Sequence, residues 1–348
     1  MDIKIGNKNI GENHKPFIIA EMSGNHNNSL ERALELVDAA ANAGVDALKI
    51  QTATPDGLTL DLSSNDFTIN DADSLWDGRT LYDLYQEATT PWEWHKTIFD
   101  RCEQHGIIGF SSPFELGAID FLESLDVPCY KIASFELVDL PLIKKAAATG
   151  KPLIMSTGMA NVSEIHSAVN AAKSVGNDQI ILLKCTSNYP ASPEDTNVKT
   201  IKHLRELFGA EVGLSDHTMG IGVPCASIAF GATVIEKHFT LSRSDGGIDS
   251  AFSLEPDELK SLVVETERAW QSLGNISYGE SSDKKSRQFR RSLYICENIK
   301  EGDVLTSDNL RIIRPGFGIE PKYYELLLGR KVNKELLKGT RMSWEHIG

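Results

Sequence analysis

The chain lacks a long apolar run, a basic tract and paired cysteines, and each absence argues against a class of protein. No apolar stretch approaches the roughly 18 residues of a membrane-spanning helix, and no signal-peptide pattern opens the chain, so neither a membrane nor export is expected. The five cysteines are scattered, odd in number and without a CxxC pair, which is typical of the cytoplasm. The formal net charge is −14 and no Lys/Arg cluster occurs, so nucleic acid is not expected as a partner.

What the chain contains is ordinary for a globular enzyme. Apolar residues make up 41% and charged residues 24% of the 348 positions. This length accommodates one barrel of about 250 residues and a small additional domain. The negative charge does not exclude an anionic substrate, because the local field at the site decides which ligand binds.

Eight short apolar runs, each leading into polar residues, recur between Phe17 and His238. They start at Phe17, Ala47, Ile107, Cys129, Leu153, Ile180, Val212 and Thr233. Helical spacing is found over residues 30–41, 92–105, 115–125, 140–149, 162–175, 197–208, 222–230 and 255–273. This alternation predicts an α/β fold, a (β/α)8 TIM barrel, whose active face lies at the carboxyl ends of the strands.

Changes in composition predict the domain boundaries. Residues 1–274 are expected to form the barrel domain, in which residues 1–16 make a hairpin on the barrel floor. Residues 275–287 are rich in Ser, Gly and charge and predict a linker, and residues 288–348 predict a small β-rich domain. Residues 52–90 are too many for an ordinary loop of a barrel and are expected to shape a substrate pocket.

Two histidines stand at the ends of neighbouring predicted strands. His217 and His238 alone would each be read as a hydrogen-bonded barrel residue. Together, beside Asp216 and Glu236, they favour a single shared divalent cation. Because a structural zinc site needs four ligands, two histidines predict an open site that water and substrate complete.

Lysines inside apolar strands predict an anion site. Lys49 and Lys131 would be costly to bury unless they were paired or held an anion, and Lys184 is expected to join them in the barrel mouth. The alternative is an internal ion pair with Glu21 or Glu136. Four hydroxyls could donate to a phosphate, although each alone is more often a strand-end cap: Ser112, Ser134, Ser156 and Ser215.

The motifs at these strand ends and in the tail resemble those of the sialic acid synthase family. They are IAEMSGNHNNSL, ALKIQT, SSPF, KIASFE, MSTGM, KCTSNYP, GLSDHTMG, EKHFT and RPGFG. The resemblance covers nearly the whole chain and implies a barrel followed by an antifreeze-like SAF domain. Within the family, KIASFE and the insertion LWDGRTLYDLYQEATTPWEWH are most similar to the branch that makes pseudaminic acid. Asn28 stands where the family often has glycine, and asparagine also tolerates a left-handed backbone.

This resemblance implies a transferase that condenses phosphoenolpyruvate with an amino sugar to give a nine-carbon keto acid. The implied sugar is 2,4-diacetamido-2,4,6-trideoxy-L-altrose, whose methyl groups Trp76, Phe135 or Phe252 would cover. Synthesis of N-acetylneuraminate or legionaminate is the alternative. The implied assembly is a domain-swapped homodimer, in which Arg314 of one chain reaches the barrel of the other.

The resemblance also implies the role of each site residue. The divalent cation, manganese or else magnesium, cobalt or a similar ion, would be held by His217 and His238. Phosphoenolpyruvate would be bound by Lys49, Ser112, Lys131, Ser134, Ser156, Ser187 and Ser215, with Asn188 as the alternative to Ser187. The sugar would be bound by Gln51, Glu136, Tyr189 and Arg314. The catalytic residues would be Glu21, His217, His238 and Asp249, with Glu21 accepting the proton of the attacking water.

Three points remain open at this stage. Asp249 lies in a glycine-rich loop, where an exposed acid is the default interpretation. A metal-dependent hydrolase on the same barrel would normally carry more metal ligands on its first strand than Glu21-Met22-Ser23 offers. A non-catalytic carbohydrate-binding protein would leave the lysines and histidines of the mouth unexplained.

Overall fold

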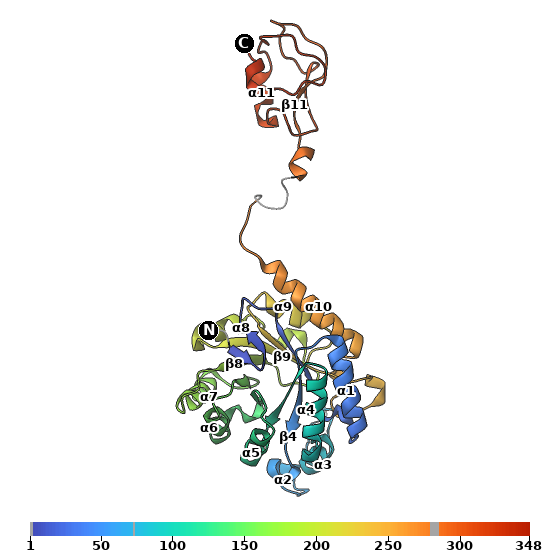
Figure 1. Ribbon diagram of the computed structural model, residues 1–348, viewed down its shortest axis with the longest axis vertical. Coiled ribbons are helices and arrows are strands. Elements are labelled where there is room, and N and C mark those ends of the chain that lie inside the picture. The colour runs from blue at the N-terminus through green and yellow to red at the C-terminus, as the bar shows by residue number, and fades with distance from the viewer. Residues whose placement is uncertain (1–2, 72–73, 279–284) are drawn as a thin grey trace. The chain divides into compact units, whose positions relative to one another are not determined.

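The computed structural model describes residues 3–71, 74–278 and 285–348 (Figure 1). The chain divides into two compact units between Leu273 and Gly274, next to the predicted domain boundary. Residues 1 and 2 of the predicted hairpin and residues 279–284 of the predicted linker lie outside the described residues. No helix in the described ranges combines the length and the apolar character that crossing a membrane requires.

The first unit is a closed barrel of eight parallel strands, which confirms the predicted fold. The strands are β3 (Phe17–Glu21), β4 (Ala47–Thr52), β5 (Ile108–Pro113), β6 (Tyr130–Ile132), β7 (Leu153–Ser156), β8 (Ile180–Cys185), β9 (Glu211–Asp216) and β10 (Val234–His238). Each strand pairs with its neighbours in sequence, and β10 closes the ring by pairing with β3. All eight carboxyl ends therefore meet at one mouth.

Helices surround these strands (Figure 1). They are α1 (Leu30–Ala43), α4 (His95–Gln104), α5 (Leu116–Ser124), α6 (Leu140–Ala148), α7 (Val162–Lys173), α8 (Thr200–Phe208), α9 (Gly222–Ile228) and α10 (Pro256–Leu273). Local signals explain their ends: the Ser29 hydroxyl accepts from the Arg32 amide at the start of α1, and Gly44 ends that helix at a φ of 90°. Asn28 has a φ of 54°, the left-handed backbone that the sequence predicted.

The barrel floor is apolar because alternate strand residues face inward. An interior cluster contains Phe17, Ile19, Ala47, Phe110, Cys129, Ile154, Ile181, Leu183 and Val234. Ile3 and Ile5 of β1 (Ile3–Ile5) and Ile10 of β2 (Lys8–Ile10) belong to the same cluster, and the two strands pair as an antiparallel hairpin. The described part of the N-terminal segment is thus the predicted floor hairpin.

The long insertion after β4 carries the short helices α2 (Pro55–Leu58) and α3 (Leu81–Ala88), and its residues 72 and 73 lie outside the described residues. The second unit contains β11 (Ser292–Ile295), β12 (Leu310–Ile313) and α11 (Tyr324–Leu327), built around a small apolar core of its own. Short 3-10 helices cover Ser23–His26, Asn65–Phe67, Trp92–Trp94, Phe135–Val138, Pro193–Asp195, Arg243–Asp245, Ser250–Phe252, Ser286–Phe289, Pro321–Tyr323 and Trp344–His346.

Candidate active site

Polar side chains fill the upper barrel because the inward alternation continues beyond the apolar floor. Ala47 of β4 faces the interior, so Lys49 and Gln51, two and four residues further on, face it as well. Steps of two residues along the other strands show which further side chains face the interior. They are Glu21, Ser112, Lys131, Ser156, Cys185, Ser215, Glu236 and His238. The interior thus changes from hydrocarbon to charged and hydroxyl groups towards the carboxyl ends of the strands.

Buried ion pairs organise this mouth. Lys49 Nζ lies 2.6 Å from Glu21 Oε2 and donates a hydrogen bond of 3.1 Å to Ser112 Oγ. Glu236 lies 3.9 Å from the Lys49 ammonium and 3.7 Å from the Lys131 ammonium. Of the two interpretations of the lysines, the internal ion pair is therefore realised for Lys49 with Glu21. An incoming anion would meet ammonium groups that carboxylates already neutralise in part.

Glu236 joins the two lysines, a role that the sequence analysis missed. Ser215 Oγ donates to Glu236 Oε1 at 3.0 Å, so this predicted phosphate ligand is engaged with a carboxylate here. Burial acts to raise the pKa of Glu236, but the ammonium groups of Lys131 and Lys49 outweigh it and hold the pKa below its usual value. The signal was present in the sequence, because Glu236 precedes His238 by two residues on one strand and so shares its face.

Glu21 is buried, and its carboxylate contacts both Lys49 and Gln51. Its other carboxylate oxygen accepts a 3.1 Å hydrogen bond from Gln51 Nε2, which also donates to Ser23. Burial raises the pKa of Glu21 above its usual value despite the adjacent Lys49 ammonium. A carboxylate with a raised pKa is a better proton acceptor than an exposed one, which suits the predicted role as a base.

His217 and His238 come together as the sequence predicted, with ring centroids 5.2 Å apart. His217 Nδ1 lies 2.8 Å from the Thr186 carbonyl oxygen, which fixes the ring. Burial acts to lower the pKa of His217, but hydrogen bonds with Cys185 and the Thr186 carbonyl outweigh it and raise the pKa. Burial holds the pKa of His238 well below its usual value, so its ring is neutral. His238 Nδ1 is buried, has no hydrogen-bond partner in the described part of the chain, and lies 3.7 Å from Asp249 Oδ2.

These features fit a divalent cation bound by two imidazoles. A neutral imidazole with a free lone pair is the form in which histidine ligates a metal, and His238 is in this form. His217 would have to give up its hydrogen bond with Cys185 to bind the ion. Within residues 3–71, 74–278 and 285–348, no three or more His, Cys, Asp or Glu side chains are arranged to hold a metal ion. Within these ranges the two imidazoles are the candidate ligands, and the remaining positions around an ion would fall to water and substrate.

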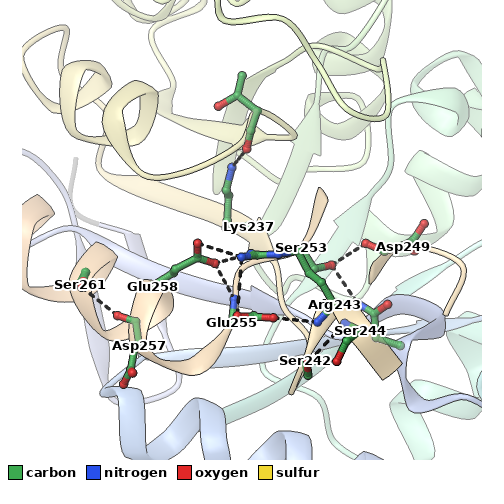
Figure 2. A network of polar contacts seen from close by, with 12 residues as sticks. Lys237, Ser242, Arg243, Ser244, Asp249, Ser253, Glu255, Asp257, Glu258 and Ser261 are labelled. Carbon is green, nitrogen blue, oxygen red and sulfur yellow. Dashed lines mark hydrogen bonds and ion pairs between the residues drawn. The ribbon is translucent and has the colours of Figure 1, made fainter. Parts of the chain in front are cut away.

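Asp249 is buried, which corrects the default interpretation of its loop as exposed. Only 6% of its surface is accessible, and burial raises the pKa of its carboxyl group although Ser23 and Gly24 donate hydrogen bonds to it. Its backbone carbonyl accepts from Ser253 Oγ at 2.6 Å, a contact visible in Figure 2. Sequence reasoning assigned exposure from glycine content alone and could not see these contacts, which join segments far apart in the chain.

Two further contacts hold the same loop. Asn25 Nδ2 donates 2.9 Å hydrogen bonds to Ser253 Oγ and to the carbonyl of Phe239, the residue after β10. Arg243 donates to the Ser253 carbonyl at 3.1 Å and pairs with Glu258 of α10 (Figure 2). The loop is thereby tied to the first strand end, the last strand end and the last helix, which fixes Asp249 beside His238.

Three of the predicted hydroxyls lie at or just after the carboxyl ends of the neighbouring strands β6, β7 and β8. A Cβ added to Gly158 would lie 2.7 Å from Ser134 Oγ and 2.8 Å from Ser187 Oγ, so only glycine fits at this point of close approach. Ser156 Oγ is buried and has no hydrogen-bond partner among the residues that the structure describes. Small hydroxyl donors around a glycine are suited to hold phosphate oxygens. Asn188, the alternative to Ser187, is exposed.

The prediction that Lys184 lies in the mouth is wrong. Leu183 faces the interior, so Lys184 faces the surrounding helices, where its ammonium donates to the Cys185 carbonyl at 2.6 Å. The inward residue is Cys185, which was not selected. Burial acts to raise the pKa of the Cys185 thiol, but hydrogen bonds from His217 and Ser134 outweigh it and lower the pKa to about 7.

A cavity of about 340 Å³ opens above these groups. Its lining includes the predicted sugar ligands Gln51, Glu136 and Tyr189, together with His238 and Asp249. The insertion after β4 supplies Leu58, Ile69, Trp76, Leu81, Leu84 and Tyr85, as expected of a segment that shapes a substrate pocket. Burial raises the pKa of Glu136 to about 7, and one of its carboxylate oxygens has no hydrogen-bond partner.

Of the three aromatic residues expected to cover methyl groups, two line this cavity. Trp76 and Phe135 do, but Phe252 is only 1% exposed and packs behind the site, with its ring centroid 4.9 Å from that of His238. Phe252 is therefore a support for the histidine and does not contact a ligand in the cavity. Arg314 is exposed in the second unit.

Fold and site together define a TIM-barrel enzyme with a lysine- and hydroxyl-rich mouth beside two histidines. The chain belongs to the NeuB family, whose model matches residues 36–278, and residues 290–348 match the SAF domain. The resemblance based on the motifs is thereby confirmed.

Three relatives place the chain within this family. It is 46% identical to a pseudaminic acid synthase of Campylobacter jejuni, with 98% of both chains covered. It is 42% identical to a pseudaminic acid synthase of Helicobacter pylori, with 95% of this chain and 98% of the relative covered. The crystal structure of an N-acetylneuraminic acid synthetase from Leptospira borgpetersenii in complex with citrate superposes with a TM-score of 0.73 at 33% identity, covering 82% of this chain and 94% of the other.

Proposed function

We propose that this chain is a transferase that condenses phosphoenolpyruvate, water and 2,4-diacetamido-2,4,6-trideoxy-L-altrose to pseudaminic acid and phosphate. The observation that carries the proposal is the pairing of an anion-binding mouth with a largely apolar cavity above the two histidines. The similarity to two pseudaminic acid synthases along nearly the whole chain supports this choice of sugar.

Phosphoenolpyruvate brings two anionic groups, which the mouth can bind separately. Lys49 and Lys131 supply buried ammonium groups, Ser134 and Ser187 supply hydroxyl donors beside Gly158, and Ser156 supplies a third hydroxyl at the end of β7. The substrate's charges would take over part of the role that Glu21 and Glu236 play towards the lysines. Ser187, which lies in this group of hydroxyls, is preferred over the exposed Asn188.

His217 and His238 would hold a divalent cation such as Mn²⁺, which when bound polarises the aldehyde oxygen of the open-chain sugar. The Thr186 carbonyl orients the His217 imidazole through its contact with Nδ1, and the Asp249 carboxylate lies 3.7 Å from His238 Nδ1. Tyr189 packs on His217 with ring centroids 4.4 Å apart and covers the site on the side of the cavity. The aldehyde carbon would thus lie next to the mouth in which phosphoenolpyruvate is bound.

The chemical step follows from this arrangement. Carbon C3 of phosphoenolpyruvate attacks the aldehyde carbon, a C–C bond forms, and positive charge develops at C2. A water molecule adds to C2 and loses its proton to Glu21, whose raised pKa suits a base. The bond between C2 and the bridging oxygen then breaks, inorganic phosphate leaves with that oxygen, and the C2 hydroxyl gives its proton to the departing phosphate as it becomes the keto group. The proton accepted by Glu21 passes to the oxygen of the former aldehyde, which becomes a hydroxyl group. Glu21 and Glu236 stabilise the developing cation electrostatically.

The test of this proposal is the release of phosphate from phosphoenolpyruvate. Release should require the sugar, stop after chelation of divalent cations, and yield a nine-carbon keto acid in equal amount. Phosphate release without sugar would indicate a hydrolase, and no release under any condition would indicate a non-catalytic carbohydrate-binding protein.

The five cysteines form no disulfide, which agrees with the proposed action in the cytoplasm.

We further propose a homodimer in which Arg314 of one chain serves the barrel of the other. The Arg314 loop is held in place, since the Ser292 hydroxyl donates to the Pro315 carbonyl at 2.7 Å and the Gly316 amide donates to the Gln288 carbonyl. An exposed guanidinium on a fixed loop can donate to the acetamido oxygens of a sugar.

Mixing two inactive variants tests this assembly. Arg314→Ala and Lys131→Ala are each expected to lower activity, and mixed dimers should regain about one active site in two, because each defect then lies on a different chain. The measurement is the specific activity after joint unfolding and refolding, against each variant treated alone. A monomer in light scattering, or no recovery on mixing, would contradict the exchange of domains.

A further inference from the structure

Trp76 carries a buried hydrogen-bond donor that no described residue uses. Its indole nitrogen Nε1 is inaccessible to solvent and has no hydrogen-bond partner among residues 3–71, 74–278 and 285–348, and Trp76 lines the cavity above the mouth. Leaving a buried N–H unpaired costs about 1–3 kcal/mol, so such a group in a ligand cavity points to an acceptor on the ligand. Trp92 shows the usual case, because its Nε1 donates to the Ala53 carbonyl at 3.2 Å.

The wall around this donor is apolar. Leu58, Ile69, Leu81 and Leu84 of the same insertion line the cavity with Trp76. A hydroxyl group placed there would gain one hydrogen bond but would bring its own hydrogen into an apolar wall. An acetamido group presents a strong acceptor oxygen and a methyl group on the same carbon, so it satisfies the N–H and the apolar wall together.

Trp76 lies away from the two histidines, where the reacting aldehyde carbon of the sugar is proposed to bind. Its ring contacts Tyr189, with centroids 5.8 Å apart, and Tyr189 in turn contacts His217. Within the described ranges, no ring contact joins Trp76 to either histidine. If the aldehyde carbon C1 lies at the histidines, as the proposed function requires, Trp76 faces a more distant part of the sugar. That part includes C4, which carries the second acetamido group.

We therefore propose that the Trp76 indole N–H donates a hydrogen bond to the carbonyl oxygen of the acetamido group at C4, and so selects sugars that carry this group. The inference rests on the proposed function and adds a specificity-determining residue to it. The unpartnered carboxylate oxygen of Glu136 in the same cavity is the complementary acceptor for an N–H or O–H of the sugar.

The test compares two sugars with the full-length protein. The first is the proposed substrate, and the second is its analogue with a hydroxyl in place of the acetamido group at C4. Trp76→Phe keeps the ring and removes the N–H. It is expected to lower kcat/KM for the diacetamido sugar about tenfold, equivalent to about 1.4 kcal/mol, mainly through KM. The value for the analogue and the KM of phosphoenolpyruvate should stay within about twofold.

The selectivity, which is the ratio of the two kcat/KM values, is measured on one sample, so it does not depend on how much of a variant is folded. Trp92→Phe is the matched control and should leave this ratio unchanged, since its N–H is satisfied within the protein. An unchanged ratio in Trp76→Phe would overturn the inference while leaving the proposed function in place. If the unsubstituted protein used neither sugar, the proposed function would fail and this inference with it.

Discussion

Replacing His217 or His238 with alanine is expected to lower kcat on the order of a thousandfold, corresponding to about 4 kcal/mol of transition-state stabilisation. Each substitution removes one of the two imidazoles whose ring centroids lie 5.2 Å apart in the mouth. A single remaining imidazole would bind a divalent cation weakly, so the metal content of the purified protein should fall together with activity. The measurements are turnover with saturating metal and the metal content by elemental analysis.

A check that each variant is folded distinguishes loss of a metal ligand from loss of structure. Both histidines are buried, so His217→Gln and His238→Gln provide variants that leave smaller cavities. His95 is the matched control, because it is buried and contacts Thr52 and the Pro91 carbonyl outside the mouth. His95→Gln should lower the melting temperature but retain metal. Full activity of the chelated protein, or normal metal content in both mouth variants, would contradict the metal site.

Glu236→Ala is expected to lower the free energy of unfolding by about 3–5 kcal/mol. The change leaves the Lys131 ammonium, which is 2% exposed, without the carboxylate that lies 3.7 Å away, and removes the acceptor of the Ser215 hydroxyl. Phosphoenolpyruvate brings negative charge to the same lysines, so it should raise the melting temperature of the variant more than that of the unsubstituted protein. The measurement is denaturant unfolding with and without the ligand.

Glu211 provides the control for this substitution. It is buried at the start of β9, but its partner Arg205 is partly exposed, so water can solvate the guanidinium after the change. Glu211→Ala should therefore cost less stability and show no extra response to phosphoenolpyruvate. Equal losses in the two variants, or no added effect of the ligand on Glu236→Ala, would mean that Glu236 does not hold the lysines for an anion.

Much of the barrel could be predicted because its signals are local. Apolar runs, caps such as Ser29 and stops such as Gly44 depend on neighbours in sequence, and the structure has the predicted strands and helices with ends shifted by a few residues. Helix α8 shows the limit: it was predicted from residue 197, but Asn197 has a φ of 45° and the helix begins at Thr200. A residue with a left-handed backbone before a helix does not change the apolar pattern, so this pattern does not show where the helix begins.

Site residues could be predicted where the chemistry of the side chain suits the site and the residue stands near the carboxyl end of a strand. His217 with His238, and Lys49 with Lys131, follow from strand ends that meet at one mouth. Lys184 failed because its inward or outward direction depends on the strand register, and a shift of one residue exchanges it with Cys185.

Contacts between segments that are distant in the chain could not be predicted from sequence patterns. The burial of Asp249 depends on Ser23, Asn25 and Ser253, which no local pattern connects. Phe252 was expected to contact the sugar because of its residue type, but the fold uses it to support His238. Such roles are decided by packing after the chain has folded, and local propensity does not encode them.

The most direct test of the proposed function is a comparison of sugars with phosphoenolpyruvate and a divalent cation. Phosphate release and product mass are measured for 2,4-diacetamido-2,4,6-trideoxy-L-altrose, for N-acetylmannosamine and for the diacetamido precursor of legionaminic acid. The account predicts the highest kcat/KM with the altrose derivative. N-acetylmannosamine lacks the second acetamido group and the 6-deoxy methyl group that suit the apolar cavity walls. The similarity to two pseudaminic acid synthases favours the altrose derivative over the precursor of legionaminic acid. Faster turnover of N-acetylmannosamine would instead indicate N-acetylneuraminate synthesis, and faster turnover of the legionaminic acid precursor would indicate legionaminate synthesis; either result would contradict the account.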